Sequence, residues 1–94
     1  MLFAVRMSVA LPPDMDEDVQ ADILTREKTY SQDLQNRGEW QQIWRCVGQY
    51  SNLSIFDVAD NERLHSILWN LPLFPYLDIE VTPLARHPSR VSAS

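Results

Sequence analysis

A glutamate beside the apolar face of a predicted helix is the residue best suited to acid–base chemistry. Four apolar side chains repeat four, seven and four positions apart: Val19, Ile23, Tyr30 and Leu34. At about 100° per residue they share an arc of roughly 60°, and Glu27 lies at about 80°, next to this stripe. Partial burial would raise the pKa of the Glu27 carboxyl, giving a base that can move a proton between two carbons. A surface glutamate paired with a basic neighbour is the alternative.

A phenol and an amide stand close together in the segment GQYSNLS, residues 48–54. Gly48, Tyr50 and Asn52 share strand parity, so Tyr50 and Asn52 can project from one face. Together they could hold a carbonyl or carboxylate oxygen of a small ligand. Because tyrosine is common in strands and asparagine in turns, a purely structural role is the alternative.

Two cations are candidates for binding an anionic ligand: Arg6 and Arg45. Arg6 and Arg45 fall in predicted strands, where surface or subunit contacts would explain them equally well. Trp44, at the start of the same segment as Arg45, is a candidate ligand wall, although such aromatics usually belong to a core or an interface.

Metal and phosphate chemistry find no support in the motifs. His65 and His87 have no further ligand at metal-binding spacing, and glycine occurs only at positions 38 and 48, so no phosphate-binding loop is present. We expect no metal.

Length and charge narrow the function classes further. The 94 residues allow one domain, residues 1–94, with one modest core. The net charge of −5 argues against nucleic-acid binding and against docking on an anionic membrane. A single cysteine fits a reducing compartment, and no signal peptide or membrane span is evident, so we expect a cytoplasmic protein.

The first half of the chain predicts one strand and one helix to position these side chains. Residues 2–11 alternate large apolar and smaller or polar residues, as a strand with one buried face does. Asp14 or Asp16 can cap the following helix, which should run to about Asn36 and stop at Gly38.

The second half predicts a hairpin, a helix and a last strand. Residues 40–58 are rich in aromatic and β-branched types and read as two strands with a turn at 51–52. A second helix has apolar residues at helical spacing over 64–71. A strand over 76–81 and an irregular tail over 85–94, loose at its end or used in assembly, complete the chain.

The order β-α-β-β-α-β predicts an α+β, ferredoxin-like fold. Its four-stranded antiparallel sheet carries both helices on one face. The other face has apolar residues to offer, so we expect the chain to associate through it as a homo-oligomer.

The segments MLFAVRMSVALPPDM, REKTYSQDLQ, WRCVGQYSNLSIFDV and LPLFPYLDIEVTPLARHPS together resemble the muconolactone isomerase family over nearly the whole chain. The resemblance implies a cofactor-free enzyme of catechol degradation that converts muconolactone, a small lactone, to 3-oxoadipate enol-lactone. It also implies decamers built from dimers, with active sites between subunits.

On this resemblance the family's helix glutamate falls on Glu27, which removes the proton at the ring C–O carbon and then returns a proton to the allylic position. Tyr50 and Asn52 match the family's hairpin segment and are candidates to stabilise charge on the lactone carbonyl. Substrate binding would fall to the cations Lys28 and Arg45 and to the pocket candidates Trp44 and Leu53.

The sequence also departs from the family pattern, with Gln42, Gln49 and Leu53 where other residues are common. Trp69 and the HPSRV ending resemble the chloromuconolactone dehalogenases, in which the same proton abstraction is followed by loss of chloride to give a dienelactone. We favour the isomerase and keep 5-chloromuconolactone dehalogenation as the alternative. A non-catalytic ligand-binding module and a quinol or haem monooxygenase of similar architecture are more distant alternatives.

Overall fold

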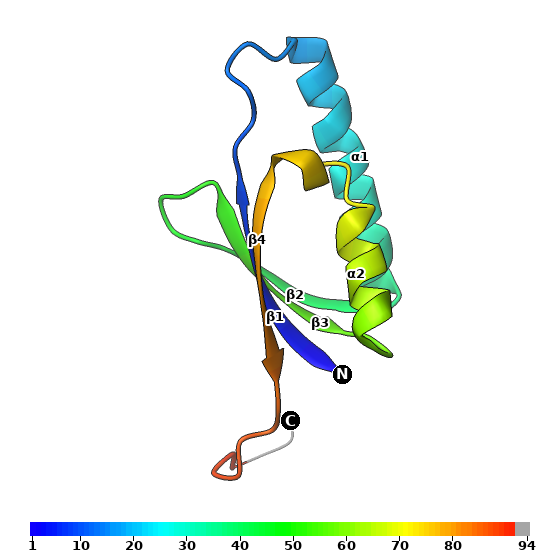
Figure 1. Cartoon of the computed structure of the whole chain (residues 1–94), viewed down its shortest axis with the longest axis vertical. Helices are drawn as coiled ribbons and strands as arrows, with labels where there is room; N and C mark the ends of the chain where they lie inside the picture. The colour runs from blue at the N-terminus through cyan, green and yellow to red at the C-terminus, as the bar shows by residue number, and fades with distance from the viewer. Residues whose placement is uncertain (92–94) are drawn as a thin grey trace.

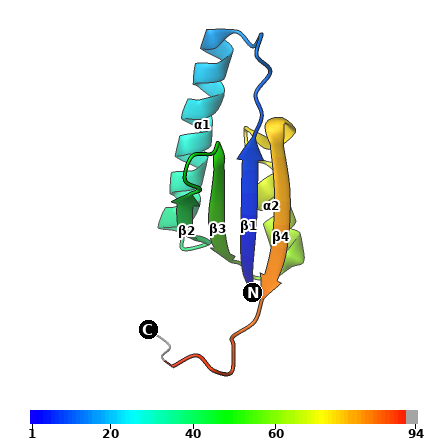
Figure 2. The same ribbon diagram turned by 90° about the vertical axis from the view of Figure 1, so that its left-hand side faces the viewer.

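The computed structural model describes residues 1–91, and its elements follow the predicted order. The seven elements are β1 (Leu2–Val9), α1 (Glu17–Asn36), β2 (Trp40–Arg45), β3 (Ser51–Asp57), α2 (Asn61–Trp69), the short 3-10 helix η1 (Phe74–Tyr76) and β4 (Leu77–Leu84). The strands form one antiparallel sheet in the order β2-β3-β1-β4, with both helices on one side of it (Figures 1 and 2). The ferredoxin-like α+β prediction is confirmed.

Local signals place the helix ends where the sequence predicts them. The Asp16 carboxylate caps α1 by accepting from the backbone N–H groups of Asp18 and Val19. Beyond the end of α1, Gly38 has φ +82°, a left-handed conformation that glycine adopts without a Cβ clash. Asp60 caps α2 in the same way as Asp16 caps α1.

The hydrophobic core lies between the sheet and the helices. It is built from inward side chains of β1, β2 and β3, from both helices and from residues just after β3 and α2, namely Phe3, Val5, Met7, Leu34, Trp40, Phe56, Val58, Leu64, Ile67, Leu68 and Leu71. Polar contacts also join the helices to their surroundings: the Tyr30 hydroxyl donates to the Ile67 carbonyl at 2.9 Å, and Arg63 forms a bidentate pair with Glu39 at 2.7 Å. The first contact holds α1 against α2, and the second holds α2 against the start of β2.

The predicted turn at 51–52 is wrong. The two strands of the hairpin are joined by residues 46–50, where Gly48 has φ +74°, and Asn52 is a strand residue paired with Arg45. The glycine that permits a left-handed turn outweighs the turn preference of Ser51-Asn52. As a result Gly48 and Tyr50 belong to the turn and do not share a strand face with Asn52.

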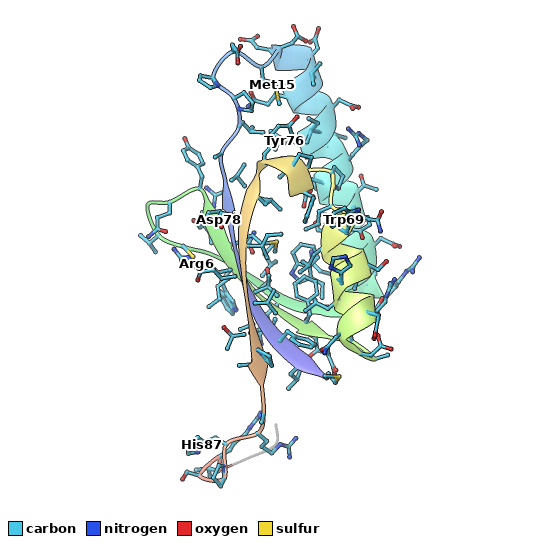
Figure 3. The ribbon with its side chains drawn as sticks, viewed as in Figure 1. Arg6, Met15, Trp69, Tyr76, Asp78 and His87 are labelled. Atoms are coloured by element: carbon cyan, nitrogen blue, oxygen red, sulfur yellow. The ribbon has the colours of Figure 1, made fainter. Side chains whose placement is uncertain are left out.

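The sheet face away from the helices, here called the open face, carries a mixed row of side chains. Trp44, Leu53, Arg6 and Glu80 are neighbours in register across the four strands. Trp44 and Leu53 keep 62% and 42% of their surface exposed. In Figure 3, Arg6 projects from this side of the sheet while Trp69 lies on α2 at the opposite side.

A register irregularity between Trp40 and Gln42 explains why Trp40 and Trp44 do not share a face. An extra residue in one strand reverses the alternation of the side chains that follow. Trp40 therefore stacks on Phe56 in the core, with ring centroids 4.8 Å apart, whereas Trp44 lies on the open face.

The chain after β4 extends away from the sheet (Figure 1). Residues 85–91 form no helix or strand, in agreement with the irregular tail predicted from the sequence. The last part of that prediction, residues 92–94, lies outside the described residues.

Candidate functional site

A cleft of about 590 Å³ opens between the first half of α1 and the β2–β3 end of the sheet. Its walls are mostly apolar, with several polar groups from the sheet and the turn: Val9, Leu11, Gln20, Leu24, Ile43, Arg45, Gln49, Tyr50, Ser51 and Asn52. A concave apolar site with a few convergent polar groups suits a small organic ligand.

Arg45 and Asn52 form the polar floor of the cleft. They are direct cross-strand partners on the side of the sheet that faces the helices, so their side chains leave the sheet close together. Among residues 1–91, no carboxylate lies within ion-pair distance of Arg45. A guanidinium without a counter-charge next to an amide donor can bind an anionic oxygen.

Tyr50 lies at the rim of the cleft, and Gln49 links the rim to the open face. The Tyr50 side chain is 84% exposed, while its backbone carbonyl accepts from the N–H of Val9 at 2.8 Å. Gln49 accepts a hydrogen bond of 2.6 Å from Arg6. Arg6 itself is therefore placed behind the turn and outside the cleft.

Glu27 lies on α1 one turn beyond Leu24, and is not among the residues that line the cleft. At 100° per residue Gln20, Leu24 and Glu27 fall within about 60°, so Glu27 continues the helix side that forms the cleft wall, about 4.5 Å further along the axis. Its Oε1 accepts from the backbone N–H of Leu73 at 2.9 Å. Among the described residues no group donates to its Oε2.

Burial is the dominant influence on the Glu27 carboxyl. Removal from water raises its pKa above the ordinary value of 4.5, and the Leu73 hydrogen bond offsets part of that rise. In the helix, Ile23, Glu27, Tyr30 and Leu34 form the inward side, while Val19 is half exposed. The carboxylate thus occupies a position within the inward face, closer to its centre than the sequence spacing indicated.

The remaining predicted site residues lie elsewhere in this chain. Trp44 and Leu53 are on the open face, across the sheet from the cleft, because the strand alternation directs them away from the helices. Lys28 is exposed on α1 and does not line the cleft. Any contact of these three residues with a ligand in this cleft would have to come from another copy of the chain.

Sequence reasoning did not single out Leu73 or Ser54. Leu73 contributes only a backbone N–H, which has no signature in the sequence. Ser54 is fully buried and donates to the Asn52 Oδ1 at 2.7 Å. The sequence did contain a sign of Ser54. Side chains two apart in a strand point to the same face, so Ser54 is a polar residue on the core-facing side with Phe56.

The described residues carry neither a metal cluster nor a membrane-spanning helix. Within residues 1–91 no group of three or more His, Cys, Asp or Glu side chains is arranged to hold a metal ion. In the same part of the chain no helix has the length and apolar character needed to cross a membrane.

Comparison with known proteins identifies the family. The family model described as muconolactone delta-isomerase matches residues 1–90. This chain belongs to the muconolactone delta-isomerase family. A muconolactone Delta-isomerase of Rhodococcus opacus is 59% identical over 90 residues, covering 96% of this chain and 97% of the relative. Muconolactone Delta-isomerase 1 of Acinetobacter lwoffii is 59% identical over 91 residues, covering 97% and 95%.

A solved structure of the family has the same fold. A crystal structure of muconolactone isomerase superposes with a TM-score of 0.95 at 49% identity, covering 100% of this chain and 98% of that one. The predicted family resemblance is therefore confirmed over almost the entire sequence.

Proposed function

We propose that this protein is a muconolactone delta-isomerase that converts muconolactone to 3-oxoadipate enol-lactone by carboxylate-mediated proton transfer in catechol degradation. The observation that carries this proposal is the half-buried Glu27, whose pKa is raised by burial, on the helix that forms one wall of an apolar cleft. The cleft also contains Arg45, which forms no ion pair with residues 1–91. The family membership and the names of the relatives support the same reaction.

In the proposed mechanism Glu27 acts first as a base and then as an acid. Its Oε2, the oxygen that Leu73 does not contact, takes the proton from the ring carbon that carries the ring oxygen, and the electron pair of that C–H bond shifts toward the lactone carbonyl. The protonated Glu27 then delivers the proton to the carbon next to the carbonyl, so the double bond moves by one position and no atom is gained or lost. A base with a pKa brought closer to neutrality suits both halves of this transfer.

We assign substrate binding to Arg45 and Asn52 at the floor of the cleft and to Tyr50 at its rim. In this proposal Arg45 holds the substrate carboxylate, and the Asn52 amide and the Tyr50 hydroxyl donate to the carbonyl oxygen as charge develops there. A substrate bound by Arg45 must reach past Leu24 to Glu27. The apolar wall of the cleft would keep water away from the reacting carbons.

We further propose that the enzyme is a cytoplasmic homo-oligomer, a decamer built from dimers that associate through the open face. The exposed Trp44 and Leu53 support this contact, because apolar side chains grouped on one sheet face favour burial. In such an assembly Trp44 and Leu53 can contact a ligand held by a neighbouring copy.

The experiment that tests the proposed function is side-by-side turnover of muconolactone and 5-chloromuconolactone by the purified protein, with ultraviolet spectra and chloride release followed together. We expect efficient formation of the enol-lactone from muconolactone. Chloride and dienelactone with little action on muconolactone would instead identify a dehalogenase. No reaction with either lactone would reject both enzymatic functions.

A further inference from the structure

Ser54 presents an unusual buried hydroxyl next to the cleft. Within residues 1–91 it is the one polar residue that is buried, with none of its surface exposed. Its direct neighbours in the sheet are Ile43 on β2 and Val5 on β1, both apolar. A hydroxyl in such surroundings destabilises the fold unless it is hydrogen-bonded, and a valine or alanine would pack there without that requirement.

The partner of this hydroxyl is the side chain of Asn52. The Ser54 Oγ donates to the Asn52 Oδ1 at 2.7 Å, and Asn52 lies two residues earlier on the same side of β3. A side-chain amide has one accepting oxygen and one donating nitrogen. With its oxygen engaged by the core, Asn52 is left with Nδ2 as the group available to the cleft.

We propose that Ser54 is a positioning residue for catalysis, which fixes the Asn52 amide so that its N–H groups, and not its oxygen, face the substrate. This inference deepens the proposed function and rests on it. With the amide reversed, Oδ1 would face the developing negative charge on the lactone carbonyl and oppose the reaction. Ser54 thereby makes Asn52 a donor that is already oriented before the charge develops.

The neighbouring cation strengthens this reading. Arg45 is the cross-strand partner of Asn52 and lines the same cleft, so an inward Oδ1 would be attracted to the guanidinium. The Ser54 hydroxyl competes with that arrangement by offering the oxygen a buried donor on the other side. Both Arg45 and the Asn52 amide then present donors to one ligand.

The test is a double-mutant cycle on muconolactone turnover with Ser54→Ala, Asn52→Ala and the combined variant. We expect Ser54→Ala to lower kcat by about tenfold with a smaller change in KM, since a donor to developing charge acts mainly in the transition state. Asn52→Ala should lower kcat by about 10²-fold. In the Asn52→Ala background the Ser54→Ala change should have no further effect on kcat, because the amide that it positions is absent.

Matched variants separate positioning from folding. Ser54→Thr retains the hydroxyl and should recover most of the kcat lost in Ser54→Ala. Thr29→Val removes a hydroxyl that donates to the Thr25 carbonyl at 3.2 Å within α1, away from the cleft, and should leave kcat unchanged. An equal loss from Ser54→Ala in both backgrounds, or no loss in either, would overturn the proposal.

A structural readout covers the case in which the wild-type protein does not act on muconolactone. Crystal structures of the wild type and Ser54→Ala at a resolution that distinguishes amide nitrogen from oxygen should show one Asn52 orientation in the wild type and a reversed or mixed orientation in the variant. Failure of turnover with this difference present rejects the proposed function alone. The same Asn52 orientation in both structures rejects the positioning role, whether or not the enzyme is active.

Discussion

The Glu27 Oε1 on α1 lies 2.9 Å from the backbone nitrogen of Leu73, which is 46 residues further along the chain. This hydrogen bond holds the carboxylate at the junction of α1 with the segment that leads into η1. The Leu73 N–H binds Oε1, and because this bond fixes the whole carboxylate group, it also fixes the direction of Oε2. A base that is held in this way loses little entropy when it meets its substrate.

Replacing the base should abolish most of the activity. We expect Glu27→Gln to lower kcat by about 10²–10⁴-fold, because glutamine cannot accept the proton. Glu62→Gln, a change of the same type at an exposed position of α2, is the control and should retain wild-type turnover. The measurement is steady-state turnover of muconolactone, with circular dichroism to confirm folding. Near wild-type turnover by Glu27→Gln would show that another group is the base.

The raised pKa of Glu27 gives two opposite pH dependences. Activity requires the ionised form, so kcat/KM should rise with pH through a midpoint above 4.5. Stability should change in the other direction. Between the unfolded pKa and the raised folded pKa the native state binds more protons, so the free energy of unfolding from this group falls as pH rises through that window and is constant above it.

Urea unfolding of the wild type and Glu27→Gln across this pH range measures the stability effect. The difference in unfolding free energy between the two proteins should change only within the window. A kcat/KM midpoint below 4.5 would contradict the burial of this carboxyl.

Arg45 should contribute to substrate binding. We expect Arg45→Ala to raise KM by about 10- to 100-fold, the range for losing a hydrogen bond to a charged group, with a smaller effect on kcat. Arg37→Ala serves as the control, since Arg37 pairs with Asp33 on the exposed side of α1. Equal KM values for the Arg45→Ala variant and the wild type would assign the carboxylate to another cation.

The ion pair between Glu39 and Arg63 should stabilise the fold in a pH-dependent way. The Arg63 hydrogen bonds hold the pKa of the Glu39 carboxyl below 4.5. Its contribution is therefore present above the unfolded pKa and is lost as pH falls through the lower folded pKa. Because both side chains are partly in water, we expect Glu39→Gln to cost only about 1 kcal/mol of unfolding free energy at pH 7. If the unfolding free energy of Glu39→Gln were still below that of the wild type at pH 2, the loss would come from packing and not from charge.

The open face should carry the subunit contact. We expect Leu53→Asp to reduce the assembly to smaller species in sedimentation velocity, because a charge would be buried opposite a neighbouring copy. Asp22→Asn on the exposed side of α1 should leave the sedimentation coefficient unchanged. An unaltered assembly in Leu53→Asp would place the contact on another surface.

Sequence alone was sufficient for the features that depend on neighbouring residues. The apolar spacing of α1 and α2 and the stop at Gly38 depend on residues close together in the chain, and the same kind of local signal narrowed the cap of α1 to Asp14 or Asp16. The order of elements then restricts the topology to few alternatives, and the ferredoxin-like sheet follows.

Tertiary structure decided the features that depend on register and on distant partners. The turn of the hairpin lies at the left-handed Gly48 and not at Ser51-Asn52. The register irregularity after Trp40 places Trp40 and Trp44 on opposite faces of the sheet. A shift of one residue in a strand reverses the face of every side chain that follows, and no local preference is strong enough to predict it. The Glu27–Leu73 hydrogen bond could not be predicted from the sequence either, because nearly every residue has a backbone N–H. Only the packing of α1 against the chain after α2 determines which N–H donates to the carboxylate.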